Sequence, residues 1–374
     1  MKHVSYIFPV SHHYRAPFHE RLRTLLAEHG VKYTVVYCAP GEENRNKGDA
    51  IDIEWGDKVG LTTLPGRLIY QHGLKRAMKS DLIIMQQENK LLLNYFLIIA
   101  SGLGRIKTAY FGHGRNFQSR KSDGLSERFK RLWATKSDWW FAYTEETRAH
   151  LRKLGFPDDR ITVFNNSVDT TRFREQIASS IPEARAKLAA SMGLIGNNVG
   201  IFVGGIYPDK RMAFLFDSAD RIRASVPDFE LIVVGGGSDL PLVIQLAESR
   251  HWVHVMGPRF GQEKIDLMLL GQVFMMPGLM GLAILDAGAA GLAIATTAFP
   301  WHSPEIAYLE SGVSGIIVAD WENPEAYADE VVALLLDGPA LDRMRAAARF
   351  MAERYSIEAM AQNFARGVLK ALAL

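Results

Sequence analysis

Short apolar runs alternate with longer stretches of helical periodicity in the first half of the chain. The runs that predict strands are 4–10, 32–39, 81–87, 106–112, 138–144 and 160–166. Helical patterns lie between them at 17–29, 90–101, 124–136 and 145–154. The apolar segment 90–101 predicts a buried helix, and the polar segment 40–66 predicts a long loop with an edge strand. Strands that alternate with helices predict a parallel sheet covered by helices, because parallel strands need crossover connections.

A second series of the same kind follows a polar, helical stretch at 169–197, which predicts a linker. Its strands are expected at 199–205, 230–237, 254–257, 273–278, 292–297 and 315–320, and two helices close the chain at 338–354 and 356–372. Because 374 residues exceed what one hydrophobic core usually supports, two domains are expected. The predicted fold class is α/β, with two doubly wound Rossmann-like domains that face a cleft. The predicted boundaries are 1–168, 198–354 and a terminal segment 355–374.

Charge and cysteine content exclude several classes of protein. The net charge is +2, with 43 lysines and arginines against 41 aspartates and glutamates, which is too small to predict a nucleic-acid partner. The single Cys38 excludes an intramolecular disulfide and a cysteine-based zinc site, and it fits a reducing cytoplasm. The first residues predict a strand and no signal peptide. Residues 270–301 are too interrupted by glycine, proline and Asp286 to predict a membrane span.

The clearest candidate chemistry follows the first strand of the second series. Open α/β sheets bind ligands at the carboxyl ends of their strands. Gly204 and Gly205 would let the backbone approach a ligand closely, and the next helix would offer its N-terminus to an anion. Lys210 and Arg211 would add charge for a phosphate. The alternative is a tight turn followed by two solvated cations.

Two further loops follow strands of the same series. Gly236 lies in a glycine triplet that could cradle a phosphate, although its spacing gives no dinucleotide fingerprint. Arg259 lies in the loop 257–261, whose backbone and aromatic residue could flank a base. Both loops could equally be plain turns that lead into helices.

Residues 276–305 are almost entirely apolar and keep one carboxylate, Asp286, before the closing Glu305. A buried carboxylate is costly unless it is paired or holds a ligand. We expect the loop 278–281 to lead into a helix on which Asp286 accepts hydrogen bonds from a ribose diol. The alternative is that Asp286 pairs with a buried cation or a backbone amide.

Several ordered segments of the chain together resemble the family 4 glycosyltransferases, which have the GT-B fold. The segments are FVGGIYPDKR (202–211), LIVVGGGSDL (231–240), the loop 254–261, MPGLMGLAILDAGAAGLAIATT (276–297), HSPEIAYLESGVSGIIV (302–318), YTEETRAHLRKLGF (143–156), ITVFNNSVDTTRF (161–173) and RYSIEAMAQNF (354–364). The last of these resembles the helix that crosses back to the first domain. The resemblance covers about 140–370.

The resemblance implies a donor site in the second domain, where Lys210 binds the diphosphate and Asp286 contacts the ribose. Asp286 takes the second position of the family's signature of two glutamates separated by seven residues. The first position falls on Gly278, and a usual basic position falls on Gly205, so the sequence resembles a branch with a PG-x-x-GLA loop. The implied donor residues are Gly204, Gly205, Lys210, Arg211, Gly236, Arg259, Gly278, Leu279, Met280, Gly281, Leu282 and Asp286. Arg211, His302 and Glu305 are candidates to replace the missing glutamate in contacts with the sugar.

The resemblance also implies that the first domain takes the acceptor. The candidate acceptor residues follow predicted strands and are His12, His13, Tyr14, Arg15, Arg115 and Asn116. His113 corresponds to a histidine near the transferred sugar, and it is a candidate catalytic residue with Lys210 and Arg211. Glu88 and Asn89 follow another strand and are further candidates.

The implied reaction is transfer of a sugar, with retention of configuration, from a nucleotide-diphosphate donor to a glycan or lipid-linked acceptor. This would serve cell-surface polysaccharide or lipopolysaccharide synthesis. No Asp-x-Asp motif lies near the donor loops, so we expect neither a metal nor a cofactor. The alternatives are a nucleotide-sugar-binding protein without transferase activity and a Rossmann-type oxidoreductase, against which the glycine spacing argues.

The segment 115–136 combines many cations with apolar residues. Phe129, Leu132 and Trp133 lie among its arginines and lysines. A segment of this composition could dock on anionic lipid at the inner face of the cell membrane. The alternative is a solvated amphipathic helix.

Overall fold

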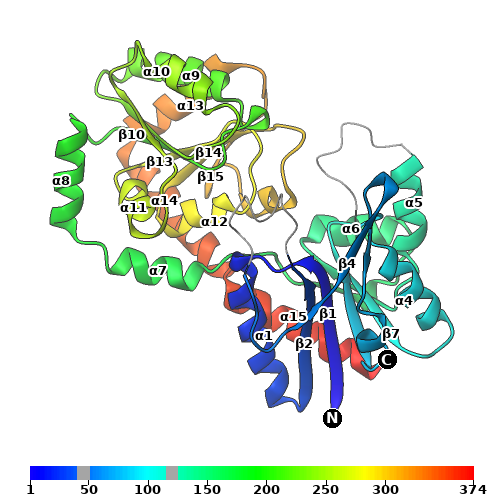
Figure 1. The fold of residues 1–374 in the computed structure, drawn as a ribbon. Helices are drawn as coiled ribbons and strands as arrows, with labels where there is room; N and C mark the ends of the chain where they lie inside the picture. Colours follow the sequence, from blue (N-terminus) through cyan, green and yellow to red (C-terminus); the bar gives the residue numbers. More distant parts are fainter. Residues whose placement is uncertain (40–50, 115–124) are drawn as a thin grey trace. The chain divides into compact units, whose positions relative to one another are not determined.

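The computed structural model describes residues 1–39, 51–114 and 125–374 and divides into two compact units. Unit 1 comprises 1–169 and 357–374, and unit 2 comprises 170–356. Each unit has a parallel sheet with helices packed against it (Figure 1). The predicted α/β class with two such sheets is therefore confirmed.

The sheet of unit 1 has seven strands in the order β3-β2-β1-β6-β7-β8-β9. The strands are β1 Lys2–Val10, β2 Val31–Cys38, β3 Asp57–Val59, β6 Leu82–Gln86, β7 Lys107–Gly112, β8 Trp139–Ala142 and β9 Ile161–Val163. The edge strand expected within 40–66 is β3, which pairs in parallel with β2. The strand order reverses between β1 and β6, so the loops that follow these two strands flank the switch point of the sheet.

A hairpin of unit 1, which the sequence analysis did not predict, forms a separate two-stranded sheet. It pairs β4 Leu61–Leu64 with β5 Leu68–Gln71 in antiparallel register. The turn η2 Pro65–Arg67 connects them, with positive φ angles of 76° at Gly66 and 63° at Arg67.

The helices of unit 1 are α1 Ala16–Glu28, α3 Leu74–Ala77, α4 Leu92–Gly102, α5 Leu125–Ala134, α6 Glu145–Lys153 and α15 Ile357–Ala373, with short turns η1 His13–Arg15 and η3 Asp158–Arg160. The prediction that 90–101 is a buried helix is wrong for one side of α4. Leu93 and Leu97 are buried, whereas Phe96 and Ile99 are more than half exposed.

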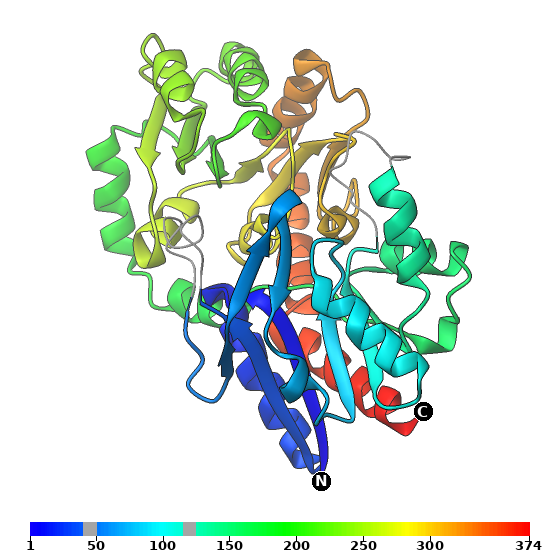
Figure 2. The same cartoon turned by 45° about the vertical axis from the view of Figure 1, so that its right-hand side comes forward.

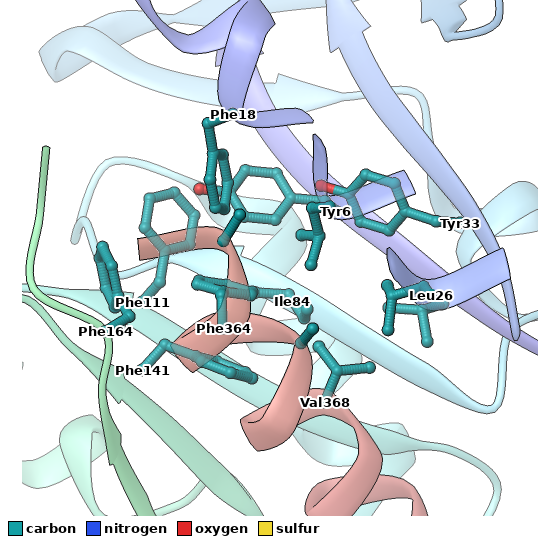
Figure 3. Packing of buried hydrophobic residues seen from close by; sticks show 14 of the residues in the cluster. Tyr6, Phe18, Leu26, Tyr33, Ile84, Phe111, Phe141, Phe164, Phe364 and Val368 are labelled. Atoms are coloured by element: carbon teal, nitrogen blue, oxygen red, sulfur yellow. The ribbon is translucent and has the colours of Figure 1, made fainter. Parts of the chain in front are cut away.

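The C-terminal helix α15 completes the core of unit 1 (Figure 3). The ring of Phe364 stacks on the ring of Phe141 in β8, with 4.0 Å between centroids. Gly367 allows α15 to approach β9 closely, because a Cβ at this position would lie 2.5 Å from the hydroxyl oxygen of Thr162 in β9. The last helix in the sequence therefore packs against the sheet formed by the first half of the chain.

Unit 2 has six strands in the order β12-β11-β10-β13-β14-β15, the order of a Rossmann sheet. The strands are β10 Val199–Val203, β11 Glu230–Val234, β12 Val253–Gly257, β13 Val273–Met275, β14 Ala293–Thr297 and β15 Gly315–Val318. The helices are α7 Thr170–Ala178, α8 Pro182–Met192, α9 Met212–Ser225, α10 Leu240–Ala247, α11 Gly261–Met268, α12 Ala283–Ala289, α13 Pro324–Leu336 and α14 Gly338–Arg354, with turns η4 Pro208–Lys210 and η5 Pro304–Tyr308. The stretch expected as a linker forms α7 and α8, which group with unit 2. The strand order reverses between β10 and β13.

No helix in the described part of the chain is long and apolar enough to cross a membrane.

Candidate functional site

Two loops of unit 2 meet at the switch point between β10 and β13. The backbone N–H of Leu279, after β13, donates to the carbonyl of Asp209, after β10, at 2.8 Å. A Cβ on Gly278 would lie 2.1 Å from that same carbonyl oxygen and 2.7 Å from the carbonyl carbon of Lys210. Position 278 therefore has no room for a side chain, which explains physically why a glycine occupies it.

Lys210 is held at the end of η4 with only 6% of its surface exposed. Its Nζ donates to the carbonyl of Leu279 and lies 3.3 Å from the sulfur of Met276. Burial lowers the pKa of Lys210 to about 8, and the charge of Asp209 opposes this shift. The side chain thus places an almost buried ammonium group at the switch point, with a carbonyl and a thioether as its hydrogen-bond acceptors. Such a group is suited to bind an anion.

Arg211 lies between Lys210 and helix α9 in the left-handed region, at φ 57° and ψ 51°. Its guanidinium lies 4.1 Å from the ring centroid of Phe214 and 4.8 Å from that of Trp321. It also donates to the backbone carbonyl of Trp321. Partial burial lowers the pKa of Arg211. Through these contacts, Arg211 connects the start of α9 with the segment that follows β15.

The glycine triplet after β11 packs directly on the loop after β10. A Cβ on Gly235 would lie 1.9 Å from the carbonyl oxygen of Gly204, and one on Gly237 would lie 2.1 Å from that of Ile206. Gly235 and Gly237 have φ angles of 151° and 152°, which favour glycine. The backbone N–H of Ile206 donates to the carbonyl of Gly236 at 2.8 Å. Close backbone packing therefore accounts for the triplet.

The loop 257–261 contacts the glycine triplet through Pro258. A Cβ on Gly236 would lie 2.9 Å from the ring of Pro258. The exposed Arg259 side chain lies 3.9 Å from Glu263. A Cβ on Gly205 would lie 2.9 Å from the ring of Tyr207, so a side chain at this position would have to displace that ring.

His302 holds the loop after β13 in place. Its Nδ1 accepts a hydrogen bond from the backbone N–H of Met280 at 2.9 Å, and its Nε2 donates to the carbonyl of Thr297 at 2.8 Å. Burial lowers the pKa of His302, which favours this neutral form. Both ring nitrogens are occupied, so the assignment of His302 to a sugar contact does not fit this geometry.

The residues of the loop 279–282 differ in how far they are exposed to solvent. Leu279 and Met280 are buried, so only their backbone could meet a ligand, whereas Gly281 and Leu282 are partly exposed. Glu305 is buried in η5, 3% exposed. The backbone N–H of Ser303, just before η5, donates to the carbonyl of Met280 at 2.9 Å.

Asp286 is half-buried on α12 and pairs with Lys264 of α11. The Lys264 Nζ lies 2.8 Å from a carboxylate oxygen of Asp286, and both side chains are 25% exposed. The same Nζ lies 5.1 Å from the ring centroid of Phe173. The alternative of pairing with a cation is therefore present in the structure, and a ribose would share the carboxylate with Lys264.

Unit 1 contains a cavity of 680 Å³ at the carboxyl ends of its strands. Three of the predicted acceptor residues, His12, Tyr14 and Arg15, line it. His13 lies in η1 beside them, and Arg115 and Asn116 lie outside the described residues. The sequence analysis did not name several other lining residues, namely Tyr6, His19, Gln86, Lys90 and Tyr143.

The segment after β6 supplies a charged pair to this cavity. Glu88 and Lys90 form a salt bridge of 2.8 Å, and the side-chain amide of Gln86 donates to Glu88 at 2.6 Å. The sequence contained a signal for Gln86 and Lys90, which the sequence analysis did not name, because the polar run QQENK (86–90) follows an apolar strand.

One histidine lines the cavity and a second lies beside it: His19 is a lining residue, and His113 contacts Tyr143, which also lines the cavity. The ring of His113 packs edge-on against Tyr143, 4.1 Å between centroids, and burial lowers the pKa of His113 to about 3. His19 shares a 2.8 Å hydrogen bond with the hydroxyl of Tyr33, and burial lowers its pKa to about 3 as well. Both imidazoles are therefore neutral at pH 7.

Comparison with known proteins gives the same family for both units. The family model for "Glycosyl transferases group 1" matches residues 197–337, and that for "Glycosyltransferase Family 4" matches residues 20–172. The chain is 26% identical over 208 residues to the GDP-mannose-dependent alpha-(1-6)-phosphatidylinositol monomannoside mannosyltransferase of Mycolicibacterium smegmatis, covering 54% of this chain and 49% of that protein. It is 25% identical over 218 residues to spore coat protein SA of Bacillus subtilis, covering 54% of this chain and 56% of that protein. The chain thus spans about half the length of these curated relatives.

Solved structures resemble the whole chain. HepE of Anabaena in complex with UDP has a TM-score of 0.72 at 17% identity, with 99% of this chain and 100% of that chain covered. WaaG, a glycosyltransferase involved in lipopolysaccharide biosynthesis, has a TM-score of 0.65 at 15% identity, with 97% and 98% covered. The chain therefore belongs to the group 1/family 4 glycosyltransferases and has the GT-B fold.

Proposed function

We propose that this protein transfers a sugar, with retention of configuration and without a metal, from a nucleotide-diphosphate donor to a hydroxyl of a glycan or lipid-linked acceptor. The observation that carries the proposal is the buried ammonium of Lys210 at the switch point of unit 2, where Arg211 and then helix α9 follow it in the chain. Relatives support it, since the HepE structures hold UDP and UDP-glucose and the mycobacterial relative is GDP-mannose-dependent. The role would be in cell-surface polysaccharide or lipopolysaccharide synthesis, at the cytoplasmic side of the membrane.

The donor diphosphate would bind beside Lys210 and the N-terminus of α9. An ammonium group has three donors, so Lys210 can bind a phosphate oxygen while it keeps the carbonyl of Leu279. A helix N-terminus adds positive potential at the same place. Negative charge grows on the diphosphate as the sugar departs, and a preorganised cation in a buried site stabilises that charge.

The sugar pocket would differ from the usual signature of the family. Because Gly278 packs on the carbonyl of Asp209, no side chain at 278 can reach a sugar hydroxyl. We place this chain in a branch with a PG-x-x-GLA loop, in which Glu305 takes over the contact with the sugar. Asp286 would accept hydrogen bonds from the ribose hydroxyls beside Lys264.

The acceptor would bind in the cavity of unit 1. Aromatic rings such as those of Tyr14 and Tyr143 suit the apolar faces of a sugar, and Arg15 and the Glu88–Lys90 pair offer polar contacts. His113 would contact the transferred sugar only as a neutral imidazole, because its pKa is about 3. It can donate or accept a hydrogen bond there, but it carries no charge at pH 7.

The test is a thermal-shift panel of UDP-, GDP-, ADP- and dTDP-sugars, followed by an assay of sugar release or transfer with the donor that binds. One donor should raise the melting temperature of the wild type, because a ligand that binds only the folded state stabilises it. Lys210→Met should abolish the shift. Lys187→Ala, at an exposed lysine of α8, is the matched control and should keep it.

Two outcomes would contradict the proposal. If no nucleotide sugar binds, the donor site is wrong. If a donor binds but is neither hydrolysed nor transferred in a cell extract that contains acceptors, the protein is a nucleotide-sugar-binding protein instead.

A further inference from the structure

The peptide group between Leu279 and Met280 is hydrogen-bonded at both of its ends. Its carbonyl, on Leu279, accepts a hydrogen bond from the ammonium of Lys210. Its N–H, on Met280, donates to Nδ1 of His302 at 2.9 Å. Lys210 follows β10, the peptide group follows β13 and His302 follows β14, and these three strands are neighbours in the sheet of unit 2 (Figure 1, Figure 2). Two side chains from different loops therefore hold one peptide group.

The planarity of the peptide bond couples these two hydrogen bonds. In a trans peptide the C=O and the N–H lie in one plane and point in opposite directions. Any rotation that turns the N–H of Met280 away from His302 must therefore turn the carbonyl of Leu279 away from Lys210. His302 thus determines the direction of an acceptor that it does not itself contact.

Burial keeps water from replacing either hydrogen bond. Leu279 and Met280 are 6% and 0% exposed, and His302 is 9% exposed. A buried polar group that loses its partner raises the free energy of the folded state, because no water can take the partner's place. We therefore expect the peptide group to keep one orientation as long as both side chains hold it.

His302 is fixed in the tautomer that the contact with Met280 requires. Its Nε2 donates to the carbonyl of Thr297 at 2.8 Å, so the proton lies on Nε2 and Nδ1 is an acceptor. The ring of Phe299 packs edge-on against the imidazole, with 5.7 Å between centroids. Burial and, to a smaller extent, the charge of Lys210 lower the pKa of His302, which favours an unprotonated Nδ1.

The backbone groups on either side of this peptide have other partners. The N–H of Leu279 donates to the carbonyl of Asp209 at 2.8 Å, and the carbonyl of Met280 accepts from the N–H of Ser303 at 2.9 Å. Neither bond uses the side chain of His302. A substitution of His302 should therefore act on the one peptide group while the rest of the loop stays attached.

We propose that His302 is a positioning residue for donor binding. By fixing the peptide group between Leu279 and Met280, it holds the carbonyl that orients the ammonium of Lys210 towards the donor diphosphate. His302 acts without touching the donor, because the protein uses both of its ring nitrogens. The link from Lys210 to the diphosphate rests on the proposed function, whereas the link from His302 to Lys210 does not.

Two substitutions of His302 separate its two hydrogen bonds. The Oδ1 of an asparagine lies near the position of the histidine Nδ1, so His302→Asn can still accept from the N–H of Met280. The amide of a glutamine reaches the position of Nε2, so His302→Gln can still donate to Thr297 but no longer holds the peptide group. Each variant loses one hydrogen bond, so urea unfolding should show a similar loss of stability in both.

Calorimetric titration with UDP and with GDP measures the consequence for the donor site. The ligand that binds the wild type should bind His302→Gln about tenfold or more weakly, because the ammonium of Lys210 is no longer held in place. His302→Asn should keep most of the affinity. The control Thr297→Val removes a hydroxyl that donates to the carbonyl of Pro277 at 2.7 Å, a bond to the same loop that does not involve this peptide group. It should bind like the wild type.

A second measurement reads the state of Lys210 and needs no donor. The pH dependence of its acetylation by acetic anhydride, followed by mass spectrometry, gives the pKa of the ammonium, which is about 8 in the wild type. Loss of the carbonyl acceptor disfavours the charged form, so the midpoint should fall by about one pH unit in His302→Gln. It should stay in place in His302→Asn and Thr297→Val. The charge of Asp209, which also acts on Lys210, is the same in all three variants.

Equal affinities and equal Lys210 midpoints in His302→Asn and His302→Gln would overturn the proposal. A loss in Thr297→Val as large as that in His302→Gln would also overturn it, because any loosening of the loop would then have the same effect. If no nucleotide sugar binds the wild type, the proposed function fails. The Lys210 midpoints would still confirm or refute the link between His302 and this lysine.

Discussion

Gly278 and Asp209 are packed so closely that a Cβ on residue 278 would lie 2.1 Å from the Asp209 carbonyl oxygen. This contact joins the loops that follow β13 and β10 directly beside Lys210. Gly278→Ala must push the two loops apart, and overpacking of this kind typically costs about 1–3 kcal/mol of folding free energy. Displacement of Lys210 should also weaken donor binding about tenfold or more. Urea unfolding and donor titration measure the two effects.

The control for this prediction is Gly281→Ala in the same loop. A Cβ there would lie 3.4 Å from the hydroxyl oxygen of Ser303, which is ordinary contact. Gly281→Ala should therefore leave stability almost unchanged. If Gly278→Ala is as stable and binds the donor as well as Gly281→Ala, the close packing at 278 does not determine the loop geometry.

Arg211→Lys should destabilise unit 2 although it keeps the charge. A lysine lacks the planar guanidinium that stacks on Phe214 and Trp321 and bonds to the Trp321 carbonyl. Loss of these contacts should cost about 1–2 kcal/mol. The control Arg221→Lys changes an exposed arginine near Glu325 and should cost less than about 0.5 kcal/mol. Equal unfolding free energies in the two variants would contradict the role given to the stacking.

Strands and helices were predictable from the sequence where their buried apolar residues recur with the spacing typical of a strand or a helix. Buried strands such as β11 appear as apolar runs, and the helices between them have the matching period. The hairpin β4–β5 was not predictable in this way, because all four residues of β4 are exposed and carry no apolar alternation. The burial of α4 was predicted wrongly because a helix that is apolar on most sides gives no sign in its sequence of which side the core covers.

Only those features of the candidate site that depend on a single segment of the sequence were predictable. Lys210 and Asp286 follow strands at positions where such sheets bind ligands, and both could be named. The contact between Gly278 and the Asp209 carbonyl depends on two loops far apart in the sequence, so spacing gives no sign of it. The hydrogen bonds that fix His302 to Met280 and Thr297 likewise arise only from tertiary packing.

The buried His19 should make the protein less stable in acid. Its folded-state pKa of about 3 is below the usual 6.5, so the unfolded chain binds the proton more readily. The stabilisation of the neutral form is present above pH 6.5 and is lost as the pH falls toward 3. Between pH 7 and pH 5 the loss should be about 2 kcal/mol for this histidine.

Urea unfolding at the two pH values measures this loss, and two variants assign it. His19→Gln removes the titrating group and keeps a polar partner for the Tyr33 hydroxyl, so it should reduce the pH dependence by about 2 kcal/mol. His29→Gln changes an exposed histidine just after α1 and serves as the control. A pH dependence that is identical in His19→Gln and the wild type would show that His19 is protonated at pH 5.

Donor binding should weaken in alkaline solution because it requires the charged form of Lys210. The pKa of this group is about 8 in the free protein, so about one tenth of the molecules carry the ammonium at pH 9. The affinity for the nucleoside diphosphate should therefore fall about tenfold between pH 7 and pH 9. Calorimetric titration at several pH values tests this. In Lys210→Arg the charge persists, so a fall of the same size in that variant would assign the pH dependence to another group.

Asp286 should contribute to donor binding through the ribose hydroxyls. Its carboxylate is paired with Lys264 at 2.8 Å but remains 25% exposed, so it can accept further hydrogen bonds. Wild-type protein should prefer the nucleoside diphosphate over its 2′,3′-dideoxy analogue by at least about tenfold, since hydrogen bonds to charged groups contribute about 1.5–3 kcal/mol. Asp286→Asn should lose most of that preference, because a neutral amide accepts hydrogen bonds more weakly. Lys264→Met breaks the same ion pair and keeps the carboxylate, so it should retain the preference. If Asp286→Asn and Lys264→Met discriminate equally well between the two ligands, Asp286 is only a partner of Lys264 and the ribose binds elsewhere.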